Sequence, residues 1–198
     1  MPTPEELEAK LWAGLRSDMT VMLGRNDHSA TGHSVTGHPL TGSADPSEES
    51  SRGLIAADAV GQTGGDGKGF SRPMTAMIDG DKDHGPLWFF TSKDSALVRA
   101  GAGPATATFV AKGHDLFARI EGHLAEATDP VMIEKLWNPF VAAWYDGKDD
   151  PDIALLRLDL DHAEIWENAS SLLAGIKALL GRKPQEDYRD KVAEVSLR

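Results

Sequence analysis

The sequence predicts a mostly β fold with flanking helices, in which six antiparallel strands form a barrel. Apolar runs of strand length recur at short intervals and are joined by glycine, proline and aspartate, which favours antiparallel strands over a doubly wound sheet. The chain contains neither a GxGxxG motif nor a P-loop, the phosphate-binding motifs of parallel α/β folds. Its 198 residues, 40% of them hydrophobic, are enough for one domain with its own core.

Charge and composition exclude several classes of function. The formal net charge of −11 argues against binding to nucleic acids or to anionic membrane surfaces, because both select for basic faces. The chain has no cysteine, which excludes disulfides, thiol catalysis and cysteine-ligated metals. No apolar run approaches the roughly 20 residues of a membrane span, and Met1–Lys10 does not resemble a secretory signal. We therefore expect a cytoplasmic protein.

The N-terminal segment predicts a helix followed by a strand. Thr3 and Glu6 have the spacing of a capping box, and Pro4 occupies the first helical position. A helix over residues 4–16 would bury the apolar side chains that recur at helical spacing, namely Leu7, Leu11, Trp12 and Leu15. Thr20–Leu23 is a short apolar run that predicts the first strand.

Residues 24–69 differ from the rest of the chain. They are rich in Gly, Ser, Thr, Asp and His and contain no aromatic residue, which predicts a low-complexity, mobile insertion between two strands. His28, His33 and His38 lie five residues apart within it, which raises the alternative of a metal site. Because no pattern places these histidines on one side, we favour a polar loop and predict no metal site.

Strands and turns alternate through the middle of the chain. Four strands are predicted, over Arg72–Ile78, Leu87–Thr91, Ala105–Lys112 and Leu116–Leu124. Turn residues in Asp79–Pro86 indicate that the first two pair with each other. Ser95–Ala100 reads as a short helix, with Asp94 or Ser92 as its cap.

The C-terminal half predicts two further helical regions around a strand region. Asp129 and Pro130 open a helix that Pro139 should split, and its apolar face comprises Ile133, Leu136, Trp137, Phe140 and Trp144. Next comes an acidic turn, Asp146–Asp152, which we interpret as a solvated turn rather than a cation site because it does not match an EF-hand.

The remaining segments complete one domain over residues 1–185. Ile153–Asp159 and His162–Glu167 predict two strands or one bent strand, and Ser171–Leu180 predicts a helix. Residues 186–198 read as a polar C-terminal tail.

One cluster of residues suggests a ligand site. Arg72 supplies a fixed cation at the start of a predicted strand. Thr91, Ser92 and Ser95 supply hydroxyl and backbone N–H groups where another strand gives way to a helix, and a helix N-terminus is a ready anion site. Together these groups suggest a cradle for a phosphorylated aromatic ligand such as flavin mononucleotide (FMN).

These residues belong to a longer set that resembles a known family. The chain resembles the general stress protein 26 group of the pyridoxamine 5′-phosphate oxidase-like, FMN-binding split-barrel family over roughly residues 1–23 and 69–185. The matching segments, in chain order, are Ser71–Met74, Leu87–Ser95, Leu136–Pro139, Ala143–Asp152 and Ala163–Trp166. The resemblance implies a six-stranded split β-barrel and a homodimer that binds flavin at the interface of its two chains.

The resemblance assigns roles to individual residues. Arg72 matches the arginine on the strand that faces the flavin, whereas Met74 and the segment Phe90, Thr91 and Ser92 match positions that flank the ring and ribityl chain. Ser95 matches the serine of a phosphate-binding motif. Trp166, in the last matching segment, is a further candidate that would close over a flavin from the partner subunit; the alternative is that it packs in the fold.

The chain also departs from the family pattern. Ala96 and Leu97 stand where the phosphate-binding motif carries basic residues, so a phosphate cation is missing. Charge-assisted hydrogen bonds are the strong ones, and each that is lost costs about 1.5–3 kcal/mol.

The sequence therefore predicts an FMN-binding protein of the stress type, with flavin-dependent oxidoreductase activity as its implied chemistry and FAD as the other possible flavin. The alternative is a non-catalytic dimeric binding or stress-response module with a degraded phosphate site. Haem or F420 is a more remote alternative, and the acidic charge disfavours the polyanionic F420 tail. No catalytic residue can be named, because the cofactor performs the chemistry in flavin enzymes.

Overall fold

The computed structural model describes residues 2–25, 71–81, 83–167 and 192–197. The first element is the helix α1 (Pro4–Ser17), which begins at the predicted capping box. Thr3 N donates to Glu6 Oε2 at 2.9 Å, and Glu6 N donates to Thr3 Oγ1 at 3.2 Å. The predicted N-terminal helix is thus confirmed. In the described part of the chain, no helix has the length and apolar character needed to cross a membrane.

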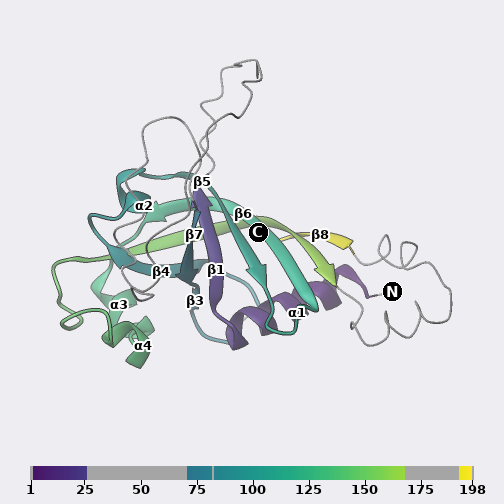
Figure 1. The fold of residues 1–198 in the computed structure, drawn as a ribbon, viewed down its shortest axis with the longest axis horizontal. Coiled ribbons are helices and arrows are strands. Elements are labelled where there is room, and N and C mark those ends of the chain that lie inside the picture. Colours follow the sequence, from purple (N-terminus) through teal and green to yellow (C-terminus); the bar gives the residue numbers. More distant parts are fainter. Residues whose placement is uncertain (1, 26–70, 82, 168–191, 198) are drawn as a thin grey trace, which may run out of the picture.

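Eight strands within the described residues form one antiparallel sheet, so the predicted fold class is confirmed, with eight strands in place of the six predicted (Figure 1). The strands are β1 (Thr20–Arg25), β2 (Ser71–Thr75), β3 (Met77–Ile78), β4 (Leu87–Ser92), β5 (Gly103–Val110), β6 (Leu116–Glu126), β7 (Ile153–Glu167) and β8 (Val192–Ser196). Their order is β2-β1-β5-β6-β7-β4-β3, and β8 pairs with β7.

The two ends of this strand order are joined by a single residue. β2 lies at one end and β3 at the other, yet only Ala76 separates them along the chain. Its N–H donates to the Met19 carbonyl at 2.7 Å rather than to either strand ladder. The sheet therefore curls into a barrel that is split between β2 and β4. The single strand predicted over Arg72–Ile78 is wrong in this respect, because Ala76 divides it.

The strand β7 organises one side of the barrel. One of its edges pairs with β6, and its other edge pairs with β4 in its first half and β8 in its second. Glu121 faces His162 while Gly122 faces Leu160, so β7 has one more residue than β6 at this point. β7 is thus the single bent strand that the sequence left open as an alternative to two strands.

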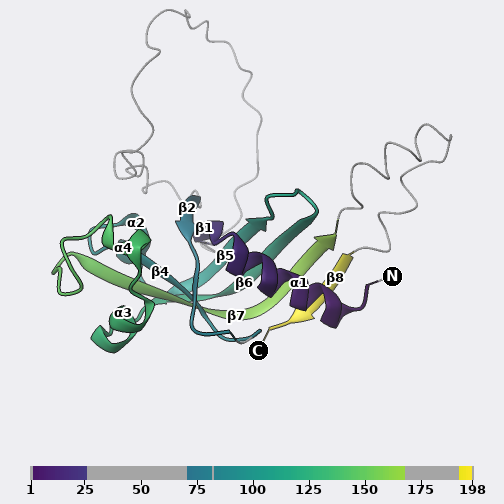
Figure 2. The same cartoon turned by 90° about the horizontal axis from the view of Figure 1, so that it is seen from below.

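Two apolar layers hold the fold together. The larger fills the barrel and includes four side chains of α1, each no more than 1% exposed: Leu7, Leu11, Trp12 and Leu15. The smaller lies on the outer face of β4 and β7, where Trp88 and Leu155 pack against the helix α3 (Pro130–Leu136). Figures 1 and 2 place α1 toward the end of the molecule that carries β8, and the remaining helices at the opposite end.

Proline divides the second helical region as predicted. Asp129 caps α3 by accepting from Val131 N at 2.9 Å, and α3 ends before Trp137. The helix α4 (Pro139–Ala142) then begins, with Asn138 as its cap. Trp144 lies beyond α4, so the predicted apolar stripe is not one helical face.

Two predicted segments have different boundaries in the structure. Gly24 and Arg25 belong to β1 rather than to the insertion over 24–69, and the rest of that insertion lies outside the described residues. Residues 192–196, which the sequence assigned to a polar tail, form β8. In this strand Val195 is buried, although its neighbour Glu194 is charged. The helix predicted over Ser171–Leu180 also lies outside the described residues.

A substitution at Gly122, which lies opposite the bend in β7, tests how much this bend contributes to stability. A Cβ at this position would lie 2.1 Å from the backbone oxygen of Asp159, and a backbone atom cannot move aside as a flexible side chain can. We expect Gly122→Ala to lower the free energy of unfolding by about 3 kcal/mol. Urea denaturation measures this change, with His123→Ala, an exposed neighbour on β6, as the control. A loss below about 1 kcal/mol would show that β7 shifts without cost.

Candidate functional site

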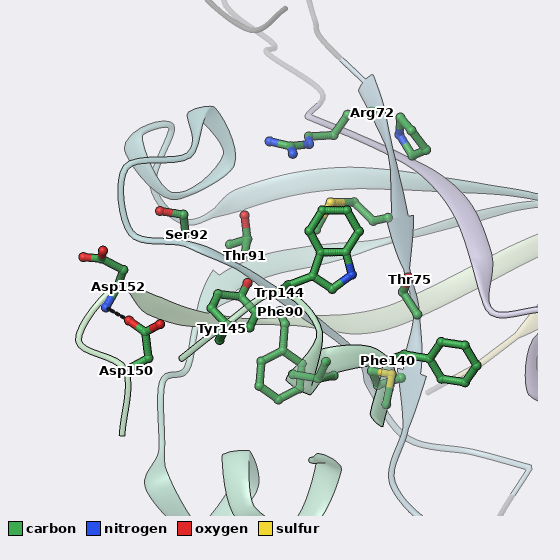
Figure 3. A pocket seen from close by; sticks show the side chains of 14 residues that line it. Arg72, Thr75, Phe90, Thr91, Ser92, Phe140, Trp144, Tyr145, Asp150 and Asp152 are labelled. Atoms are coloured by element: carbon green, nitrogen blue, oxygen red, sulfur yellow. Dashed lines mark hydrogen bonds between the residues drawn. The ribbon is translucent and has the colours of Figure 1, made fainter. Parts of the chain in front are cut away.

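A cavity of about 620 Å³ opens at the split between β2 and β4. Figure 3 shows its side chains, which come from β2 and β3, from the end of β4, from α4 and the segment after it, and from the turn before β7. The lining residues are Arg72, Pro73, Met74, Thr75, Met77, Phe90, Thr91, Ser92, Phe140, Val141, Trp144, Tyr145, Asp150 and Asp152.

The strand β2 supplies one wall of the pocket. Arg72 and Met74 are two positions apart on this strand, so their side chains lie on the same face of it. Met74 is 8% exposed and belongs to the barrel core, whereas Arg72 is half-buried and extends from β2 toward the side where Thr91 and Ser92 lie (Figure 3). No hydrogen bond or ion pair joins the Arg72 side chain to another residue in the described part of the chain.

The end of β4 supplies the opposite wall. Phe90 lies edge-on to Trp137, with ring centroids 6.2 Å apart, and tilted against Tyr145 at 6.3 Å. Thr91 is 5% exposed, and Ser92 follows it at the last position of the strand. The wall therefore changes within three residues from an aromatic surface to one that carries two hydroxyl groups.

Two exposed aromatic side chains stand at the opening. Phe140 on α4 is 71% exposed and Trp144 is 66% exposed, although both line the pocket. Exposed apolar side chains that gather in one patch mark sites of ligand or protein contact. The sequence assigned both residues to a packing stripe; in this chain alone, neither is packed.

The acidic turn is the remaining part of the lining. Both carboxylate oxygens of Asp150 accept backbone hydrogen bonds, Oδ1 from Asp152 N at 2.9 Å and Oδ2 from Asp146 N at 3.0 Å. These bonds, chiefly the one from Asp152, lower the pKa of Asp150, and the nearby Lys93 charge lowers the pKa further. Asp150 is thus a carboxylate that holds the turn, and it places negative charge beside the pocket.

Hydroxyl groups near the end of β4 already have partners. Ser92 Oγ donates to Asp94 Oδ1. Ser95 Oγ accepts from Val98 N at 3.4 Å and caps the helix α2 (Ala96–Arg99), so the predicted caps Asp94 and Ser92 are wrong. Ser95 is the N-cap because its extended backbone directly precedes the first helical residue.

The structure brings five of the seven predicted site residues to this pocket: Arg72, Met74, Phe90, Thr91 and Ser92. Ser95 is 7% exposed and lies outside the lining. Trp166 lies near the end of β7 that pairs with β8, and it does not line the pocket of its own chain.

Sequence reasoning missed several lining residues. Tyr145, Asp150 and Asp152 belong to the segment 143–152, which was singled out for the family resemblance and not for a ligand role. The adjacent aromatic pair Trp144 and Tyr145, followed by acidic residues, was the available signal. The three histidines of the predicted insertion lie outside the described residues. Within the described ranges, no three His, Asp or Glu side chains form a group that could hold a metal ion.

Comparison with known proteins identifies relatives of the chain. A model of the family described as pyridoxamine 5′-phosphate oxidase-like matches residues 56–187. No curated protein matches the chain.

Solved structures give the same result. The general stress FMN/FAD binding protein from Xanthomonas citri is 45% identical, with 84% of this chain and 92% of that one covered and a TM-score of 0.59. A protein of Xanthomonas campestris pv. campestris attributed to the general stress family is 44% identical, with the same coverage and a TM-score of 0.58. A protein from Jannaschia sp. CCS1 attributed to general stress protein 26 is 23% identical, covers 97% of this chain and 99% of its own, and shares the fold at a TM-score of 0.63.

The pKa of Asp150 leads to a prediction about acid stability. A carboxyl group whose pKa is lowered in the folded chain stabilises that chain above its unfolded pKa of about 3.9, and the contribution is lost as the pH falls through the lower folded value. We expect Asp150→Ala to be less stable than the wild type at neutral pH, and the difference to disappear well below pH 4. Urea denaturation at several pH values measures it. The control is Asp149→Ala, which removes an exposed carboxylate with no hydrogen bond to any described residue.

Proposed function

The chain belongs to the pyridoxamine 5′-phosphate oxidase-like family, and from this premise we propose that it binds a flavin in the pocket between β2 and β4. Its relatives include general stress proteins, one of which is an FMN/FAD binding protein. The proposal makes this chain a flavin-binding protein of the general stress type.

One observation carries the proposal. Five residues that the sequence selects as flavin contacts come from two strands that are not neighbours in the sheet, and they line one cavity. Arg72 and Met74 stand on β2, and Phe90, Thr91 and Ser92 stand on β4.

The chemistry of the lining fits a flavin. An isoalloxazine ring is large, flat and apolar on its faces, and the pocket offers Phe90, Tyr145 and Trp144 together with the thioethers of Met74 and Met77. A ribityl chain carries hydroxyl groups, and Thr91 and Ser92 offer hydroxyl partners at the other side of the pocket. Among the residues that line the pocket, Arg72 is the cation that could bind a phosphate. FMN is the flavin we propose, with FAD as the alternative.

Oxidoreductase activity is the finer part of the proposal. A bound flavin supplies hydride and single-electron transfer, and the protein supplies position and electrostatics. In this chain, the buried wall of β4 would orient the ring. The exposed Trp144 and Phe140 would exclude water from its outer part once a substrate or second chain covers them.

A non-catalytic binding module is the second candidate, and Leu97 favours it. The family carries basic residues at the positions of Ala96 and Leu97, yet Leu97 is 1% exposed and packs in the barrel core. A binding module would hold flavin without turnover. Reduction of the bound flavin by a nicotinamide hydride donor, measured as the loss of the flavin's blue absorbance, separates the two candidates. An oxidoreductase reduces its flavin in this way, and a binding module does not.

Flavin binding is tested by titration. Adding FMN to the purified protein should quench flavin fluorescence with a dissociation constant of tens of micromolar or less. Trp144→Ala should weaken binding about tenfold, because it removes an aromatic surface from the pocket mouth. The control is Val131→Ala on α3, since Val131 is 70% exposed but does not line the pocket. If the wild type leaves the fluorescence unchanged at such concentrations, the proposal is wrong.

We also propose that the chain forms a homodimer in the cytoplasm, with Trp166 of one chain reaching the flavin held by the other. Trp166 is half-buried and does not line the pocket of its own chain, so only a second chain would bring it to a flavin. Light scattering at micromolar concentration should give twice the mass of one chain, and Trp166→Ala should weaken FMN binding. A monomer that still binds flavin would contradict the proposed assembly.

A further inference from the structure

We propose that this pocket selects a flavin by its ring and hydroxyl chain and gains little from a terminal phosphate, so that riboflavin binds nearly as tightly as FMN. The inference rests on the proposed function and specifies its ligand. It follows from the hydrogen bonds and charges at the polar side of the pocket, where the end of β4, α2 and the acidic turn meet.

The two serine hydroxyl groups at this side already make hydrogen bonds within the chain. Ser92 Oγ donates its hydrogen to the Asp94 carboxylate, so only its lone pairs face a ligand, and these repel phosphate oxygens. Ser95 Oγ accepts from the N–H of Val98, and the side chain is 7% exposed and lies outside the pocket lining. A phosphate could recruit the Ser92 hydroxyl as a donor only by breaking the bond to Asp94, which cancels much of the gain.

The net charge of the described pocket lining is negative. Arg72 is its cation, and Asp150 and Asp152 are its carboxylates, which leaves one negative charge in excess. The two hydrogen bonds that Asp150 accepts from the turn keep it ionised. An FMN phosphate carries close to two negative charges at neutral pH. Attraction by Arg72 is therefore offset by repulsion from carboxylates on the same side, whereas riboflavin has no charge to be repelled.

Among the described residues, no further cation lines the pocket. Leu97 is in the core. The Arg99 guanidinium donates to the backbone carbonyl of Asp94 and lies outside the lining. The helix α2 has only four residues, too few for a helix dipole that could hold a phosphate by itself. Arg72 is thus the one cation in the described lining, and two carboxylates share that lining with it.

Parallel titrations of the full chain with riboflavin and with FMN test the inference. We expect dissociation constants within about tenfold of each other, where a phosphate site with two or three charge-assisted contacts would separate them by a hundredfold or more. A hundredfold preference for FMN would overturn the inference and leave the flavin proposal intact. Failure of both flavins to bind would overturn the flavin proposal itself, and this inference with it.

A pair of charge-neutralising variants tests the cause. Asp152→Asn removes a carboxylate that lines the pocket, and we expect it to tighten FMN binding about five- to tenfold with less than a twofold effect on riboflavin. Asp149→Asn makes the same change three residues earlier, on an exposed side chain outside the lining, and should leave both affinities within about twofold. Equal effects of the two variants on FMN, or equal effects of Asp152→Asn on both flavins, would contradict the inference. Thermal melting of each variant verifies that the fold is unchanged.

Discussion

The passage of the chain through Ala76 is the constraint on which the pocket depends. β2 is held by β1 at one end of the strand order, and β3 is held by β4 at the other, so the chain has to cross from one edge to the other within one residue. The hydrogen bond from Ala76 N to the Met19 carbonyl anchors that crossing, and Ala76 is fully buried. Because β2 and β4 do not pair, side chains rather than backbone ladders line the space between them. The cavity lies in that space.

The strand β4 gives this opening a rigid wall. Phe89 points into the barrel core at 0% exposure, while Trp88 packs at 7% exposure in the smaller layer beneath α3. A strand that is buried on both faces cannot shift its register without unpacking two layers at once. Its pairing with β7, in which Phe90 faces Leu155, therefore fixes where Thr91 and Ser92 emerge. In this way the packing of the core determines the positions of the groups that line the pocket.

Local signals in the sequence predict the local structure well, and their failures share a cause. The capping box at Thr3 and the break at Pro139 each depend on residues a few positions apart, and both appear as predicted. The division of Arg72–Ile78 depends on Met19, more than 50 residues away, and β8 depends on its pairing with β7. Periodicity within one segment carries no information about such distant partners. The exposed Trp144 is a similar case, since the apolar pattern does not reveal whether a face is covered.

The candidate site shows the same limit at the level of single atoms. A strand end with Thr91, Ser92 and Ser95 looks from its composition like an anion site, because it is rich in donors. The composition of a segment shows how many hydrogen-bond donors it has. A ligand can bind only to donors that make no hydrogen bond within the folded chain. Here a carboxylate two residues from Ser92 takes one hydroxyl, and the first turn of α2 takes the other. Two of the three residues that recommend the segment as a phosphate cradle, Ser92 and Ser95, thus already bond to their own neighbours. Arg72, on a different strand, makes no hydrogen bond or ion pair with another described residue.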